Sequence, residues 1–195
     1  MGEVADCSST RVPTAGTMGS MEAAPPPAEP DATDWTFVLE AGCPECGYEL
    51  HDPVLTGERL RAAVPRWAEV LGRPDVARRP SEHVWSPLEY ASHSRDLVAV
   101  LGERVDAMLT GEDPVLSDYD GEAAAVRGQF WANDPDEVAQ QIAVGTESTV
   151  AVLGRVEGDD WECTGRRGDG RPFTVTEMCR YLLHDVEHHL HDVQG

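Results

Sequence analysis

The sequence predicts an all-α protein, a four-helix bundle with long connections and a disordered N-terminal tail. Four segments carry apolar residues at helical spacing, and three of them open with a helix-start signal. No stretch alternates polar and apolar residues for long enough to predict a substantial strand. Four amphipathic helices of similar length bury their apolar faces best against one another, which favours the bundle.

The composition narrows the class of protein. The chain has 195 residues, is 41% hydrophobic and carries a net charge of −21, which suits one packed domain with a tail. Its acidity disfavours nucleic acids and anionic membranes as partners. No apolar run approaches the roughly 18 residues of a membrane helix, and no signal-peptide pattern opens the chain. We therefore expect a soluble, cytoplasmic protein.

The N-terminal region divides into a tail and a lead-in. Residues 1–33 are rich in Ser, Thr, Gly, Ala and Pro, which predicts disorder. The globular domain spans 34–195, and its lead-in, residues 34–54, contains Cys43-Pro44-Glu45-Cys46-Gly47. This CPxCG turn is typical of rubredoxin and zinc-ribbon knuckles, but the chain has no second CxxC. Three interpretations stay open: a turn with reduced thiols, a zinc half-site completed by His51 or another chain, and a redox pair.

The first two helices are predicted at 56–71 and 87–109. The first has Leu60, Val64 and Trp67 on its apolar face and Gly72 as its stop, while Pro65 predicts a kink or a later start. The second opens with Ser86-Pro87-Leu88-Glu89, an N-cap serine, a proline at the first helical position and a glutamate that closes a capping box.

The last two helices are predicted at 135–154 and 175–193. Asp134-Pro135-Asp136-Glu137 repeats the same start signal, and Thr174 forms a plain capping box with Glu177. The connections 110–134 and 155–173 are long, and the second is glycine-rich with room for a short hairpin.

A cluster of histidines near the C-terminus predicts a metal site. Four of the seven histidines lie within residues 184–191, and His184 and His188 lie one turn apart on the same side of the last helix. Such a pair can bind one divalent metal, although the glutamate of an HExxH protease is missing. His93, at the edge of the apolar stripe of the second helix, is the candidate third ligand. The apolar stripe of the last helix lies almost opposite the pair, however, so a solvated histidine face is the alternative.

The order and spacing of these motifs resemble the DinB-like superfamily. The matching pieces are Trp85–Glu89 leading to His93–Asp96, the loop before the last helix, and His184–His188, over roughly residues 55–193. The resemblance implies a four-helix bundle with a triple-histidine site on His93, His184 and His188. It also implies a divalent metal, with Zn²⁺ favoured and Ni²⁺ or Fe²⁺ suited to the same ligands. A thiol-dependent S-transferase or isomerase is then expected, using a thiol such as mycothiol on a small electrophile. Homodimers are common among such proteins.

Further residues receive predicted roles around that site. We expect Asp96 to hydrogen-bond to His93 or to accept a proton near it, and His191 to act as a proton shuttle. Arg166 and Arg167, in the glycine-rich loop, are placed to bind a carboxylate of the thiol or substrate. Three alternatives stay open: a metal-dependent hydrolase, a non-catalytic metal-binding or protein-interaction module of the same fold, and a metal-free bundle.

Overall fold

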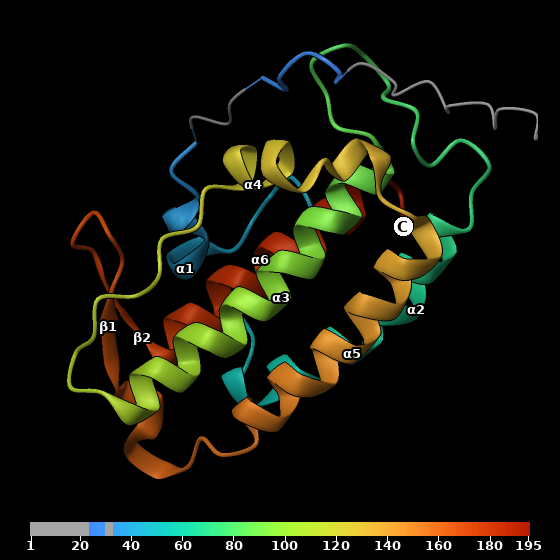
Figure 1. The fold of residues 1–195 in the computed structure, drawn as a ribbon. Coiled ribbons are helices and arrows are strands. Elements are labelled where there is room, and N and C mark those ends of the chain that lie inside the picture. Colours follow the sequence, from blue (N-terminus) through green and yellow to red (C-terminus); the bar gives the residue numbers. More distant parts are fainter. Residues whose placement is uncertain (1–23, 30–32) are drawn as a thin grey trace, which may run out of the picture.

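A computed structural model describes residues 24–29 and 33–195. Its framework is a bundle of four helices, α2 (Thr56–Leu71), α3 (Pro87–Thr110), α5 (Pro135–Leu153) and α6 (Val175–Asp192). α3 packs against α5 and α6, and α2 packs against the same two helices (Figure 1). Although α2 and α3 are consecutive in the bundle, they therefore lie diagonally across it. The predicted fold class is confirmed.

The helix-start signals predicted from the sequence make capping hydrogen bonds in the structure. At α3 the Glu89 amide donates to Ser86 Oγ, and the Glu89 carboxylate accepts from the Ser86 amide at 2.8 Å. Thr174 and Glu177 form the same reciprocal pair at α6. These contacts satisfy amides that have no partner within their helix. Pro65 lies inside α2, which still begins at Thr56, so the helix does not start late.

The long connections contain short elements that the sequence did not predict in detail. The first holds α4 (Gly121–Gly128) and a 3₁₀ turn at Phe130–Ala132. The second holds a 3₁₀ turn at Gly158–Glu162 and the expected hairpin, formed by β1 (Thr164–Arg166) and β2 (Pro172–Thr174) in antiparallel register. α4 packs on α3 near the end of the bundle where α3 begins (Figure 1).

Part of the predicted disordered tail has a defined place. Residues 1–23 and 30–32 lie outside the described residues, but residues 24–29 run in an extended conformation along the loop before α3. Arg79 donates to the Pro26 carbonyl at 2.7 Å, and the Glu29 amide donates to the His83 carbonyl at 2.9 Å. Ala28, which lies between Pro26 and Glu29 in the sequence, is buried. These contacts place residues 24–29, which belong to the predicted disordered tail, against the loop, and the boundary between tail and domain stays a prediction.

The lead-in lies against α6. It forms a 3₁₀ turn at Trp35–Phe37, the short α1 (Val38–Ala41) and a second 3₁₀ turn at Pro53–Leu55, and α1 contacts α6 (Figure 1). In consequence α6 is buried on two sides, by the bundle and by the lead-in. Among the described helices, none has the length and hydrophobicity of a membrane-spanning segment.

Candidate metal centre

The three histidines predicted to share one metal all line one cavity, but the structure does not bring their ligand atoms together in one group. His93 comes from α3, and the other two come from α6. The structure instead brings together two groups whose ligand atoms all lie within 4.8 Å of one another: His93, Asp185 and His189 in one, and Cys43, Cys46, His184 and His188 in the other. The grouping of His93 with the other two predicted ligands is thus corrected, while metal binding by each residue stays a prediction.

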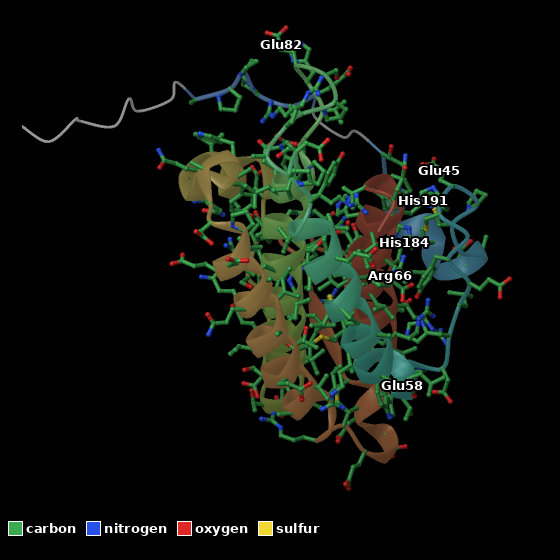
Figure 2. The ribbon with its side chains drawn as sticks, turned by 90° about the vertical axis from the view of Figure 1, so that its right-hand side faces the viewer. Glu45, Glu58, Arg66, Glu82, His184 and His191 are labelled. Carbon is green, nitrogen blue, oxygen red and sulfur yellow. The ribbon has the colours of Figure 1, made fainter. Side chains whose placement is uncertain are left out.

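The geometry of α6 explains the division. Each residue turns the helix by about 100°, so α6 carries two pairs with i, i+4 spacing side by side. The pair Asp185 and His189 is turned toward the buried stripe that holds Leu182 and Val186, and therefore faces α3. The pair His184 and His188 lies further round, where the lead-in covers it; Figure 2 shows His184 on that side of α6.

His189 is held between two carboxylates. Its Nε2 lies 3.0 Å from Asp185 Oδ1, and its Nδ1 lies 3.0 Å from Asp192 Oδ2. Burial opposes protonation of the ring, but the two carboxylates outweigh it and raise the pKa of His189. Burial likewise disfavours the charged form of Asp185, yet the hydrogen bond and charge of His189 lower the pKa of this carboxyl group. A metal fits here because Asp192 can hold the Nδ1 proton while Nε2 and Asp185 bind the cation.

His93 presents one free ring nitrogen to this group. Its Nδ1 lies 3.0 Å from the Tyr119 hydroxyl, which leaves Nε2 as the ligand atom. Burial, followed by the nearby charge of His189, lowers the pKa of His93 to about 4. The ring is therefore neutral at pH 7, the form that binds metal ions.

Asp96 is connected to His93 through Tyr119. Its carboxylate accepts from Arg95 Nε at 2.8 Å. The same carboxylate lies beside Tyr119 and, after burial, is the main influence that raises the pKa of the hydroxyl. Asp96 therefore lies next to the residue that contacts His93 Nδ1, and its role at the site stays a prediction.

The group of His93, Asp185 and His189 borders a cavity of about 630 Å³. Aromatic side chains, Trp35, Trp85 and Tyr90 among them, form part of its wall. A volume of this size accommodates a small-molecule ligand. Three protein ligands that border such a cavity are the arrangement of catalytic rather than structural metal sites.

Two arginines also line the cavity. Arg104 of α3 is buried and donates from Nη2 to the Ser117 carbonyl at 2.8 Å, while its Nε has no hydrogen-bond partner among the described residues. Arg167 pairs with Asp169 at 2.5 Å and lies over the ring of Phe173. A buried guanidinium with an unused N–H is suited to binding a carboxylate or phosphate. Arg167 is one of the two arginines predicted to bind an anionic group, whereas no sequence motif singles out Arg104.

Three other predicted residues lie away from this cavity. Arg166 is exposed and pairs with Asp113 at 2.6 Å. His191 is exposed and borders a separate depression of about 410 Å³, on the lead-in side of α6 (Figure 2). His51 uses both ring nitrogens, at 2.9 Å from the Tyr48 hydroxyl and 2.9 Å from Thr56 Oγ1, and is absent from the group around Cys43. The structure therefore does not place these three residues where their predicted roles require.

Gly121 leaves room for the ring of His93, so replacing this glycine tests the site. A Cβ atom at this position would lie 2.8 Å from His93 Cε1. We expect Gly121→Ala to displace the ring and to weaken metal binding in the cavity about 10-fold, the effect of disturbing a ligand's support. Titration of the metal-free protein with Zn²⁺ measures the change. Gly145→Ala is the matched control, since a Cβ there meets no atom within 4 Å; equal affinities in the two variants would contradict the packing argument.

Comparison with known proteins agrees with this architecture. The sequence profile of the DinB superfamily matches residues 56–193. Among curated proteins, none shows significant sequence similarity to the chain. Among solved structures, the chain is similar to YfiT from Bacillus subtilis, described as a probable metal-dependent hydrolase with an unusual four-helix bundle topology. The two share 16% identity with a TM-score of 0.64, over 73% of this chain and 82% of YfiT, a similarity of fold. The chain belongs to the DinB superfamily.

Proposed function

We propose that this protein is a metal-dependent enzyme whose metal is held by His93, Asp185 and His189, and that it transfers or isomerises a small electrophile with the help of a low-molecular-weight thiol. The observation that carries the proposal is the three-ligand group at the border of the 630 Å³ cavity. A divalent metal bound there supplies Lewis-acid chemistry, which favours the deprotonated form of a thiol or of water.

The residues around the cavity divide the remaining work. Tyr119 orients His93, and Asp192 orients His189, so that each ring offers Nε2. Arg104 and Arg167 bind the anionic group of the thiol or of the electrophile. In a transfer, the thiolate sulfur forms a bond to an electrophilic carbon, whose leaving group departs with the bonding electrons. In an isomerisation, the thiolate adds to a conjugated double bond, the resulting single bond rotates, and the carbon–sulfur bond then breaks to release the thiolate and restore the double bond. The aromatic walls limit the access of water to the thiolate.

The proposal is tested with the purified full-length chain loaded with Zn²⁺, Ni²⁺ or Fe²⁺. Mycothiol, glutathione and bacillithiol are each offered together with an aryl halide, an epoxide or a conjugated carbonyl compound. We expect turnover that requires both the metal and one of the thiols. No turnover in a chain with confirmed metal would favour a non-catalytic metal-binding or protein-interaction module.

A hydrolase is the second candidate, because YfiT, with the same fold, is described as a probable metal-dependent hydrolase. In that reaction water replaces the thiol as the nucleophile. The same preparation offered ester and amide substrates without thiol distinguishes the two. Hydrolysis that is indifferent to added thiol would replace the transferase proposal.

Arg104 is expected to determine affinity for anionic substrates. Arg104→Met keeps much of the side-chain volume in α3 but removes the charge and the unused N–H. Losing one hydrogen bond to a charged group costs about 1.5–3 kcal/mol, so we expect KM for the anionic component to rise about 10-fold or more, with a smaller change in kcat. Arg166→Met removes an arginine outside the cavity and serves as the control. An equal rise in KM in both variants would contradict the assignment.

A further inference from the structure

The CPxCG turn of the lead-in has the backbone of a metal knuckle. The Gly47 amide donates to the Cys43 carbonyl at 2.9 Å, and the Cys43 amide donates to the Tyr48 carbonyl at 2.8 Å. Gly42 and Gly47 have φ values of 72° and 75°, a region that glycine adopts readily. A Cβ on Gly42 would lie 2.3 Å from the Tyr48 carbonyl oxygen. The two glycines thus permit a tight turn that holds both cysteines at one point.

Two histidines of α6 face this turn. The ligand atoms of Cys43, Cys46, His184 and His188 all lie within 4.8 Å of one another. Cys43 Sγ lies 3.7 Å from His188 Nδ1. Zinc bonds of about 2.3 Å to sulfur and 2.0–2.1 Å to nitrogen, at a tetrahedral angle, put such atoms about 3.6 Å apart. The observed separation is therefore that of two ligands of one ion.

The surroundings of two further ring nitrogens, Nε2 of His184 and Nε2 of His188, support the same conclusion. His184 is 2% exposed, and its Nε2 is buried with no hydrogen-bond partner among the residues described. A buried polar atom without a partner is costly and calls for an explanation. The Nε2 of His188 lies 3.6 Å from Asp192 Oδ1, on the opposite side of the ring from Cys43. A carboxylate at that place orients a histidine whose Nδ1 binds a metal.

We propose that Cys43, Cys46, His184 and His188 form a closed, tetrahedral Zn²⁺ site, distinct from the metal of the cavity. The pattern C-x2-C with H-x3-H is that of structural Cys2His2 sites. Four protein ligands leave no position for substrate, so this site fastens the lead-in to α6 and takes no part in turnover. It joins segments that are far apart in the sequence, and because its four ligands converge only in the folded chain, zinc binding is linked to folding.

The zinc site borders the cavity directly, because His184 and His188 line it together with Trp35 and Asp192. Trp35 forms part of the cavity wall, and its ring centroid lies 5.5 Å from that of His184 and 4.7 Å from that of His188. The Asp192 carboxylate faces His188 with one oxygen and His189, from the other group, with its second oxygen. Loss of zinc is therefore expected to loosen one wall of the cavity while leaving the ligands of the catalytic metal in place.

Cobalt replacement and metal counting test the proposal on the full-length chain. Co²⁺ bound to thiolates gives sulfur-to-metal charge-transfer absorption, which nitrogen and oxygen ligands do not give. We expect two metal ions per chain and this absorption in the wild-type protein. The double variant Cys43→Ser, Cys46→Ser should keep one metal and lose the absorption. His93→Ala should keep the absorption and lose the other metal, and Cys163→Ser, outside both groups, should behave as the wild type.

Two outcomes would overturn the zinc site. One is a wild-type protein loaded with Co²⁺ that shows no thiolate absorption; this measurement needs no variant, so it holds even if the cysteine variants fail to fold. The other is a Cys43–Cys46 disulfide in protein purified with its metal content intact, which would make the turn a redox pair. Either result leaves the proposed cavity metal standing, because that metal is judged by the His93→Ala count.

Discussion

His189→Ala is expected to abolish metal binding in the cavity and to lower the metal-dependent turnover about 1000-fold or more, while His188→Ala causes a far smaller loss. The two residues are neighbours on α6, but only His189 shares a group with His93. A metal contributes several kcal/mol to catalysis, and about 1.4 kcal/mol corresponds to a tenfold change in rate. Steady-state rates at saturating metal, with metal counts for each variant, measure the difference.

The same two variants distinguish the ligand group seen in the structure from the three histidine ligands predicted from the sequence. If His93, His184 and His188 hold the metal, His188→Ala should lose the activity and His189→Ala should keep it. Circular dichroism and thermal melting confirm that each variant is folded. His191→Ala, at an exposed position one turn further along α6, is expected to leave both metal content and turnover unchanged.

Glu89→Ala is expected to lower the free energy of unfolding by about 3–5 kcal/mol. Glu89 is fully buried, and its carboxylate pairs with Arg79 and accepts from the Ser86 amide in the capping box of α3. Removing one partner of a buried pair leaves the other charge uncompensated, and the helix loses its cap as well. Chemical denaturation of the two proteins gives the difference. Because α3 carries His93, a weaker helix start should also raise the metal concentration needed for half saturation.

An exposed pair provides the control. Arg61 and Glu147 form an ion pair between α2 and α5, with side chains 53% and 61% exposed. Water screens such pairs, and they contribute little to stability. We therefore expect Glu147→Ala to have the same melting temperature as the wild type. A Glu89→Ala variant as stable as Glu147→Ala would contradict the role given to the buried pair.

The sequence predicts the fold well, because the signals that decide it are local. N-cap side chains, prolines at the first helical position and capping glutamates lie within four residues of one another. Three of the four main helices, α3, α5 and α6, therefore begin at the residues that these signals predict. No local signal in the sequence shows which segment covers which face of α6. That depends on the lead-in, whose contact with His184 and His188 joins residues far apart in the chain.

The candidate site was predicted in part for the same reason. The structure places His93 beside the C-terminal cluster, but the residues of that cluster grouped with it are Asp185 and His189, not the predicted His184 and His188. The apolar stripe of α6 favours this grouping, since the i, i+4 pair that borders the stripe is Asp185 and His189. A search limited to histidine pairs passes over an aspartate–histidine pair. The partners of the CPxCG turn could not be found from spacing, because they lie about 140 residues away.

Anomalous diffraction from crystals of the zinc-loaded full-length chain would locate the metal ions themselves. We expect two peaks at the zinc edge, one bounded by His93, Asp185 and His189 and the other by the two cysteines with His184 and His188. A single peak that joins His93 to His184 and His188 would show that the metal is held by the three predicted histidines instead.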